Sequence, residues 1–266
     1  MISIRFVGAS AAVVAAAVVY GLTWLTPKND LSIYTAAEWW SPTSSFSILH
    51  RMNEVRVPFF IAHLPTNGSI ADLGCGGGLV TEPVGLSGKF HSVQGFDINE
   101  ASLEKARAHL PATSVVTYKL GSIYEIPLPS SSVDGVIVSD VFEHLDDLPK
   151  ALSEVQRILK PNGVLVFDTI ARTWWSWLST YFVAQELLGI VQPGAHDWSM
   201  FINPEELETE LIKAGFATNR AQWIGIGASM SLLNAWKHKS LYYLIESFFE
   251  DRTDLSSSYM GAARKP

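Results

Sequence analysis

Short apolar runs alternate with stretches of helical periodicity along most of the chain. The apolar runs predict strands at residues 69–73, 91–96, 115–120, 133–139 and 164–168. The helical periodicity predicts helices at residues 32–40, 47–63, 81–86, 99–110, 149–159 and 204–213. This alternation predicts an α/β fold with a doubly wound, mostly parallel sheet, in which ligands bind at the carboxyl ends of the strands.

The first thirty residues stand apart from this pattern. Residues 6–25 carry no charge and are long enough to cross a bilayer as a helix. We therefore assign residues 1–30 to a transmembrane anchor or a targeting segment. A cleaved secretory signal and a mitochondrial import sequence both remain open, although import sequences are usually Arg-rich and amphipathic. Residues 31–266 form the remaining domain.

A second apolar segment, residues 174–198, follows the fifth predicted strand as a helical insertion. It begins with Trp174, Trp175 and Trp177, and such a density of tryptophan suits a membrane interface or a lid over an apolar substrate. An additional core helix is the alternative. At its end, His196 and Asp197 either line the site or form a structural hydrogen bond. Residues 227–250 are a third apolar segment, for which a helix is the expected structure.

A glycine-rich loop follows the first strand and reads Asp72-x-Gly74-x-Gly76-x-Gly78. Glycines there let the backbone approach a ligand and adopt φ values that other residues avoid. Asp97 ends the next strand about twenty residues on, the spacing at which a carboxylate binds ribose hydroxyls. The loop resembles motif I of class I S-adenosylmethionine (SAM) methyltransferases rather than the loop of dinucleotide-binding proteins. A glycine turn with solvated acids is the alternative.

Composition narrows the function classes. The net charge is −7 and no run of Lys or Arg occurs, which argues against a nucleic-acid partner because phosphate binding requires a basic surface. Cys75 is the single cysteine, so an intrachain disulfide is excluded.

Two carboxylates and an imidazole, Asp140, Glu143 and His144, follow the fourth strand directly. In a helical turn they would share one face, because their spacings are i, i+3 and i, i+4. They could bind a divalent ion such as Mg²⁺, although imidazole is a less usual ligand for Mg²⁺. Alternatively, His144 is a general base for a phenolic hydroxyl, or Glu143 and His144 only cap and orient the turn.

Several motifs stand in one order along the chain. They are Trp39-Trp40, His50-Arg51-x-Asn53-x-x-Arg56, Asp72-x-Gly74-Cys75-Gly76-Gly77-Gly78, Glu143-His144, Gly194-Ala195-His196-Asp197 and Phe201-Ile202-x-Pro204-x-Glu206-Leu207. Over roughly residues 38–225 and the last few residues, this order resembles the ubiquinone-biosynthesis O-methyltransferase family.

The resemblance implies a Rossmann-like class I methyltransferase with a seven-stranded sheet, SAM as co-substrate and a possible Mg²⁺ ion. The loop and the resemblance together give the residues expected to contact SAM: Arg56, Asp72, Gly74, Gly76, Asp97, Ser122 and Ser139. Arg56 is expected to bind the SAM carboxylate with its guanidinium, with a surface arginine as the alternative. The expected catalytic residues are His144 and Glu143, and the expected metal ligands are Asp140, Glu143 and His144.

The implied reaction is methylation of a phenolic hydroxyl of a polyprenyl dihydroxybenzoate or polyprenyl catechol, and of demethylubiquinol. The implied surroundings are a membrane surface, in a eukaryote the matrix side of the mitochondrial inner membrane, and a multiprotein complex for ubiquinone synthesis. A methyltransferase for another lipid or small phenol and a SAM-binding assembly subunit are two alternative functions.

The chain departs from the family pattern at three places. Asp140 stands where the family usually has Glu, so its carboxylate reaches one methylene less far. Ser139 replaces a usual Met, which leaves a backbone contact to SAM as the expectation. The usual Asn-Pro turn is not recognisable between residues 226 and 258, so substrate identity is less well determined than SAM binding.

Overall fold

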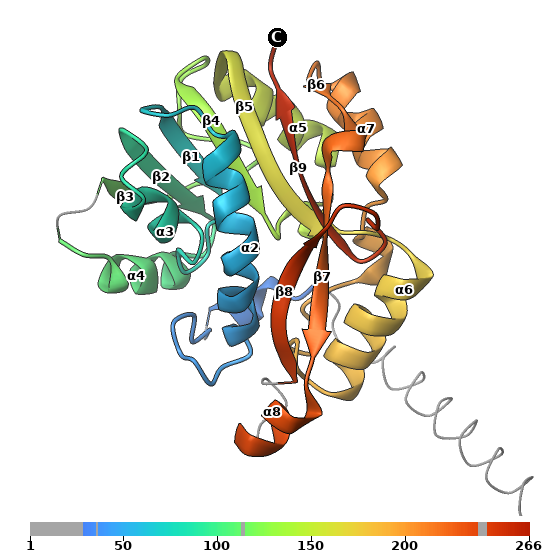
Figure 1. Ribbon diagram of the computed structural model, residues 1–266. Coiled ribbons are helices and arrows are strands. Elements are labelled where there is room, and N and C mark those ends of the chain that lie inside the picture. Colours follow the sequence, from blue (N-terminus) through green and yellow to red (C-terminus); the bar gives the residue numbers. More distant parts are fainter. Residues whose placement is uncertain (1–28, 36, 113–114, 239–243) are drawn as a thin grey trace, which may run out of the picture.

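The computed structural model describes residues 29–35, 37–112, 115–238 and 244–266 (Figure 1). These residues form a nine-stranded sheet with the order β3-β2-β1-β4-β5-β9-β7-β8, and β6 pairs with β9 off this path. The strands are β1 (Ser69–Leu73), β2 (Ser92–Asp97), β3 (Val116–Leu120), β4 (Val133–Ser139), β5 (Leu159–Ile170), β6 (Ala217–Thr218), β7 (Ile224–Met230), β8 (Ile245–Asp251) and β9 (Ser258–Arg264).

The five predicted strands are confirmed and pair in parallel as β1 to β5. The remaining strands pair antiparallel at one end of the sheet. The expected count of seven strands is too low. The helix expected over residues 227–250 is also wrong, because strand β7, helix α8 (Leu232–His238) and strand β8 occupy this region. An apolar run is compatible with a helix or a strand. Here residues 224–230 form a strand, because β7 can pair with β9.

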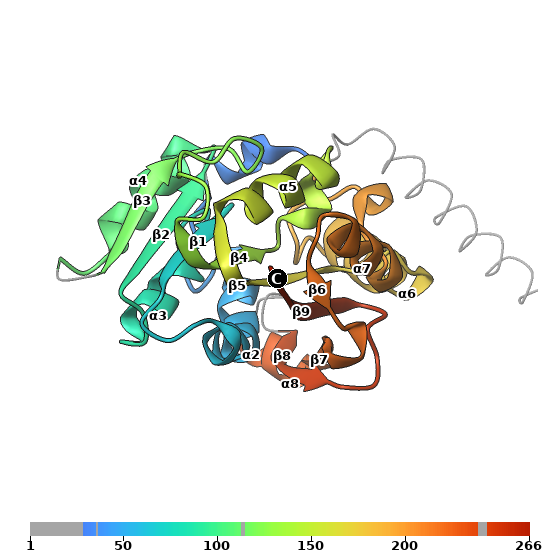
Figure 2. The ribbon, with the colours of Figure 1, turned by 90° about the horizontal axis from the view of Figure 1, so that it is seen from above.

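Helices cover both faces of the sheet. In Figure 2, α2 (Ser47–His63) and α3 (Thr81–Leu86) lie on one face, and α5 (Leu148–Ile158) and α7 (Pro204–Lys213) lie on the other. Helix α4 (Glu100–His109) shares the core cluster of α2 and α3. An asparagine is the N-cap of both α4 and α7. The side chain of Asn99 accepts from the backbone of Ser102, and Asn203 forms a capping box with Glu206.

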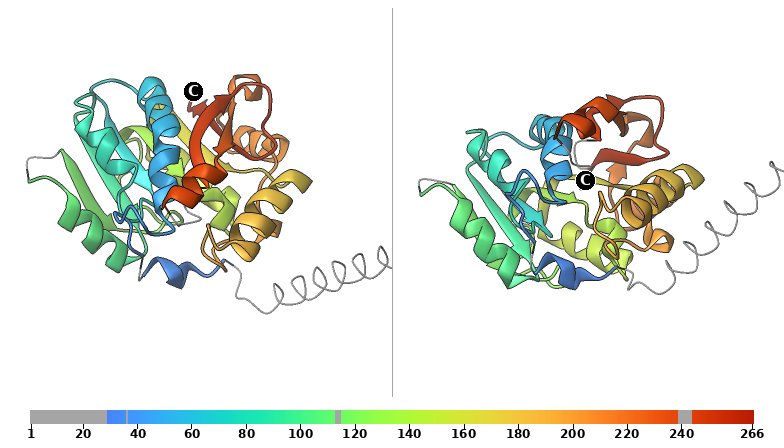
Figure 3. Two further views of the ribbon diagram at one scale, coloured as in Figure 1. Left: turned by 60° about the horizontal axis from the view of Figure 1, so that its bottom comes forward. Right: turned by 90° about the horizontal axis from the view of Figure 1, so that it is seen from below.

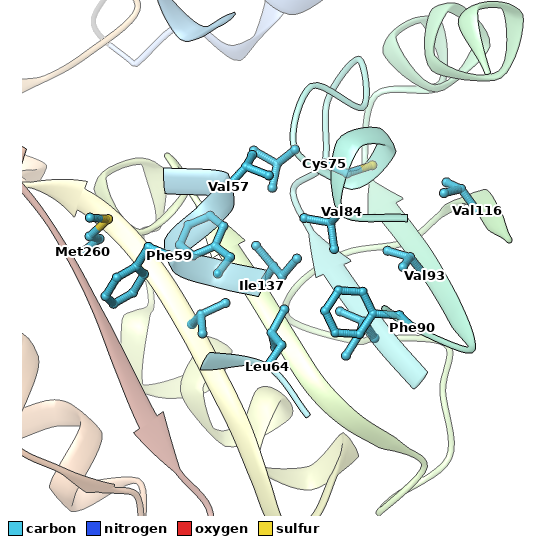
Figure 4. Packing of buried hydrophobic residues seen from close by; sticks show 14 of the residues in the cluster. Val57, Phe59, Leu64, Cys75, Val84, Phe90, Val93, Val116, Ile137 and Met260 are labelled. Carbon is cyan, nitrogen blue, oxygen red and sulfur yellow. The ribbon is translucent and has the colours of Figure 1, made fainter. Parts of the chain in front are cut away.

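A cluster of buried apolar side chains packs the first helical layer against the sheet. Figure 4 shows Val57 and Phe59 of α2 beside Ile137 of β4 and Met260 of β9, with Val84 of α3 further along the same layer. This packing fixes α2 across the middle of the parallel sheet, and α2 is the helix that carries Arg56.

The segment ahead of α2 differs from the expectation. A short 3-10 helix, η1 (Leu31–Tyr34), replaces the helix expected over residues 32–40. Turns follow it and bring Trp39 into a small buried cluster with Ala37, Phe46 and Leu79. Within the described ranges, no helix combines the length and apolar character needed to cross a bilayer. The span expected at residues 6–25 lies outside those ranges.

The insertion after β5 is helical, as expected. The short helix α6 (Trp174–Ser176) continues into the π-helix η3 (Trp177–Leu187), and two 3-10 turns follow later, η4 (Trp198–Met200) and η5 (Arg220–Gln222). Tyr181 and Gln185 are buried, whereas Trp174 is 75% exposed and Trp175 is 55% exposed. The insertion therefore packs against the protein with one side and presents tryptophans on another.

Candidate functional site

A cavity of about 690 Å³ lies at the carboxyl ends of the parallel strands, between η1 and the glycine loop. All seven residues expected to contact SAM line it: Arg56, Asp72, Gly74, Gly76, Asp97, Ser122 and Ser139. Asp140 and His144 line it too. Its volume is typical of a pocket for a cofactor-sized ligand.

The glycine loop takes its shape from both backbone and packing. Gly74 and Gly76 have φ values of 75° and 51°, in the left-handed region that favours glycine. The indole of Trp39 covers the loop so closely that a Cβ on Gly77 would lie 2.1 Å from its Cγ. Trp40 donates from Nε1 to the carbonyl oxygen of Gly77 at 3.0 Å. Both tryptophans therefore pack on the glycine loop.

Asp97 is held by the backbone. Its two oxygens accept hydrogen bonds from the amides of Gly76 and Asn99, each at 2.8 Å, and burial raises its pKa. A carboxylate offers about four lone-pair positions, so Asp97 retains acceptor capacity toward the cavity. Asp72 accepts from Thr81 Oγ1 at 2.6 Å, and burial raises the pKa of Asp72 to about 7.

Arg56 is buried and forms an ion network that the sequence did not indicate. Its Nη1 donates to Asp140 and, at 3.1 Å, to Asp168 Oδ2, and its Nε donates to Asn53 Oδ1 at 2.6 Å. The hydroxyl of Ser139 donates to Asp168 Oδ1 at 2.5 Å, so the side chain of Ser139 is already engaged. Asp168 could have been found as an acid near the end of a buried strand, as Asp97 is.

The electrostatics of this network are asymmetric. Burial pushes the pKa of Asp140 up, but the charge and hydrogen bond of Arg56 outweigh burial and leave it below the usual value. Burial and the charge of Asp140 raise the pKa of Asp168 to about 8 despite Arg56. Near neutral pH, Arg56 is therefore paired mainly with an ionised Asp140.

The turn after β4 does not place its three polar residues on one face. Asp140 has a φ of 51°, and the 3-10 helix η2 (Phe142–His144) begins only after it. A positive φ is tolerated by Asp better than by most residues, and it directs the Asp140 carboxylate to Arg56. Glu143 and His144 instead meet His196, with one ligand atom from each of the three within 4.8 Å of the others.

Burial sets the charge of this cluster. It is the main cause that raises the pKa of Glu143 well above its usual range, and the charge of Asp140 adds to the effect. Burial lowers the pKa of His144 to about 4 and that of His196 to about 3, so both imidazoles are neutral near pH 7. A bound divalent ion would favour the ionised form of Glu143, and one carboxylate with two neutral imidazoles is a suitable set of ligands for such an ion.

Comparison with known proteins identifies the fold and the family of the chain. A family model described as a methyltransferase domain matches residues 71–167. A SAM-dependent methyltransferase from Thermotoga maritima, titled a possible histamine N-methyltransferase, superposes with a TM-score of 0.56 at 20% identity, over 83% of this chain and 92% of that one. At this identity the likeness shows the fold alone.

Two curated relatives are more similar in sequence. The mitochondrial ubiquinone biosynthesis O-methyltransferase of Bos taurus is 33% identical over 74% of this chain, which spans only 60% of the bovine protein. The ubiquinone biosynthesis O-methyltransferase of Paramagnetospirillum magneticum is also 33% identical, over 70% of this chain and 79% of the relative. Because the identity to the Paramagnetospirillum magneticum protein extends over most of both that protein and this chain, the chain belongs to the ubiquinone biosynthesis O-methyltransferase family.

Proposed function

We propose that the chain transfers a methyl group from SAM to a phenolic hydroxyl of a polyprenylated ring in ubiquinone synthesis. The observation that carries the proposal is one cavity that joins the glycine loop and Asp97 to His144. The names of the relatives support the pathway. The chain spans 60% of the length of the bovine protein, so we only propose, and do not conclude, that it shares the activity of that protein.

The protein contributes alignment and a phenolate. Methyl transfer requires the phenolate oxygen, the methyl carbon and the sulfonium sulfur in line, and alignment of this kind is worth several kcal/mol. The C–O bond forms as the C–S bond breaks, and the sulfonium leaves as a neutral thioether. We expect Asp97 and the glycine loop to hold the donor, and the rings of Trp39 and Tyr34, which line the cavity, to limit the access of water.

We propose His144 as the residue that acts on the phenolic hydroxyl. It lines the cavity, and its Nδ1 faces the side-chain oxygen of Asn29 at 2.6 Å, which leaves the Nε2 lone pair for chemistry. Nε2 either takes the phenol proton or helps to hold a divalent ion with Glu143. When bound there, a divalent ion would lower the pKa of the phenol and orient the acceptor oxygen.

We propose a membrane surface as the partner of the exposed apolar side chains on α6 and α8. Trp174, Leu232 and Trp236 are 75%, 80% and 77% exposed. The helix α6–η3 and helix α8 both lie at the end of the molecule toward which the carboxyl ends of the parallel strands point, and Figure 3 shows this end from two sides. Exposed tryptophans favour the lipid interface, and a polyprenylated substrate would reach the cavity from there. The mitochondrial inner membrane and a multiprotein complex stay predictions from the resemblance.

Product analysis tests the proposed reaction. The purified protein is incubated with SAM and a polyprenyl catechol, and it is expressed in a strain that lacks its ubiquinone O-methyltransferase. We expect methylated product and restored ubiquinone with wild type and with His91→Gln, an exposed histidine, and at least a tenfold loss with His144→Gln. Full transfer by His144→Gln and Glu143→Gln would contradict the chemistry, and turnover of another phenol without rescue would favour the alternative substrate class.

Vesicle binding tests the membrane surface. We expect the protein to sediment with vesicles of mixed neutral and anionic lipids, and the pair Trp174→Ser and Trp175→Ser to reduce the bound fraction severalfold. Leu86→Ser is the matched control, because Leu86 is 52% exposed on α3. Equal binding by the tryptophan variant and the control would contradict the proposal.

A further inference from the structure

Glu143, His144 and His196 form a side-chain cluster in which each member is oriented by a second group. Glu143 and His144 belong to η2 after β4, and His196 lies at the end of the insertion after β5. The two imidazole rings are nearly parallel, with centroids 5.2 Å apart and planes 18° apart. One ligand atom from each residue lies within 4.8 Å of the other two, which is close enough for one ion to reach all three.

The hydrogen bonds fix the tautomer of both histidines. Asn29 donates from Nδ2 to the carbonyl oxygen of His144 at 3.3 Å, so its Oδ1 is the atom that faces His144 Nδ1 at 2.6 Å. Gln185 repeats this arrangement: its Nε2 donates to the carbonyl oxygen of His196 at 3.3 Å, and its Oε1 faces His196 Nδ1 at 3.0 Å.

Because an amide oxygen only accepts, both Nδ1 atoms carry the proton and both Nε2 atoms carry a lone pair. A side chain that accepts from Nδ1–H is the usual support of a metal-bound histidine. Within the described residues, the hydroxyl of Tyr34 contacts His144 Nε2 at 3.5 Å, the long limit of a hydrogen bond.

The hydrogen bonding of Glu143 is a second, independent indication that the cluster can bind a cation. Its Oε2 accepts from Thr169 Oγ1 at 2.7 Å. Its Oε1 is buried and has no hydrogen-bond partner among the described residues. A buried carboxylate oxygen without a partner is costly, and a cation between Glu143 and the two imidazoles would satisfy it.

Asp140 does not complete this set. Its carboxylate accepts from Arg56, and its shorter side chain and positive φ keep it on that side of the turn. The donors that remain are two imidazole nitrogens and one carboxylate oxygen. Mg²⁺ prefers oxygen ligands in an octahedral arrangement, whereas two imidazoles and one carboxylate suit first-row transition metals such as Mn²⁺, Fe²⁺, Co²⁺ and Zn²⁺.

We propose that Glu143, His144 and His196 bind one transition-metal ion, that His196 takes the place expected for Asp140, and that Gln185 and Asn29 hold the two imidazoles in position. One part of this inference rests on the proposed function: an ion held by these residues would act on the phenol in the cavity, which His144 lines.

Metal titration of the full chain tests the ligand set without any assay of activity. The protein is treated with chelator, and calorimetry with Mn²⁺, Zn²⁺ and Mg²⁺ is combined with the visible absorption of added Co²⁺. We expect one Mn²⁺, Zn²⁺ or Co²⁺ per chain, bound at least a hundredfold more tightly than Mg²⁺. His196→Gln should weaken binding at least tenfold and change the Co²⁺ spectrum. Gln185→Ala should weaken binding about 10–100-fold, the usual cost of losing a group behind a metal ligand.

Asp140→Asn and His91→Gln are the comparison variants, and both should bind Co²⁺ within about threefold of wild type with an unchanged spectrum. Far-UV circular dichroism identifies any variant that fails to fold, and in that case Gln185→Ala provides the test in place of His196→Gln. Loss of binding in Asp140→Asn with normal binding in His196→Gln would overturn the proposal, as would equal affinity for Mg²⁺ and Mn²⁺. Absent metal binding together with full methyl transfer would refute this inference alone, whereas tight binding without transfer would refute only the proposed function.

Discussion

Replacing Arg56 with Met is the sharpest test of the buried ion network. The change keeps much of the apolar volume of the side chain but leaves Asp140 and Asp168 without their cation. Breaking a buried ion pair by removing one partner typically costs 3–5 kcal/mol, because an uncompensated charge stays behind. Asp168 has a pKa of about 8 and is mostly protonated near neutral pH, so the cost comes mainly from Asp140, whose side chain is 25% exposed. We therefore expect a loss of about 3 kcal/mol, the lower end of the range for such pairs.

Urea unfolding at pH 7.5, followed by circular dichroism, measures this loss. The matched control is Arg252→Met, which removes an exposed pair with Glu250 and should cost less than about 0.5 kcal/mol. The double variant Arg56→Met with Asp140→Asn should recover part of the loss, because the stranded charge is gone. Since Arg56 holds the pKa of Asp140 low, its contribution is present above the unfolded-state pKa and is lost as the pH falls through the folded-state value. The difference between wild type and Arg56→Met should therefore be lost completely only below about pH 4, the ordinary pKa of an aspartate.

Two results would refute this reasoning. One is a loss below about 1 kcal/mol, which would place Arg56 in the class of exposed ion pairs. The other is a double variant that is less stable than Arg56→Met, which would show that the cost comes from lost packing or from Asn53 rather than from a stranded carboxylate.

Three further predictions concern the loop, the histidines and a helix cap. Gly77→Ala should displace Trp39, because the new Cβ would lie 2.1 Å from the Cγ of Trp39. The change should lower the unfolding free energy by about 1–3 kcal/mol and weaken the binding of SAM. Unchanged stability and unchanged SAM affinity, both measured by calorimetry, would contradict this. In EDTA, the unfolding free energy of wild type should fall relative to that of His196→Gln between pH 7 and pH 4.5, by up to about 3 kcal/mol. The reason is that burial keeps His196 neutral in the folded state, with a pKa of about 3, while the unfolded state takes up a proton. Parallel curves of unfolding free energy against pH for the two proteins, measured in urea, would argue against this. Asn99→Ala should cost about 1 kcal/mol in thermal or urea unfolding, because the amide of Ser102 loses its cap, and an effect near zero would exclude a role of this cap in stability.

The sequence predicted the parallel part of the sheet well. Each strand there is marked by an apolar run and by a glycine or an acidic residue at its end, and all of these lie close together in the chain. The strands carrying Asp72 and Asp97 end where expected, and the residues expected around SAM line one cavity. Patterns of this kind depend only on neighbours in the chain.

The sequence could not predict contacts between distant segments. Asp140 was expected beside Glu143 from their spacing, but the pairing of Arg56 with Asp140 spans 84 positions and a positive φ turns the carboxylate toward it. His196 was a candidate for the site. Its position beside His144 depends on the path of the insertion after β5, and no short stretch of sequence indicates that path. The segment at residues 227–250 became two strands because a partner edge was available at β9, which a single stretch cannot reveal.

The place of β9 in the sheet has a consequence for synthesis. This strand hydrogen-bonds to β5 on one side and to β7 on the other, so it separates two parts of the sheet that precede it in the chain. While a ribosome still covers residues 258–264, the hairpin of β7 and β8 has no edge to join, and the edge of β5 stays open. Until residues 258–264 have left the ribosome, a nascent chain would expose two unpaired backbone edges, which are the surfaces that chaperones shield and at which aggregation begins.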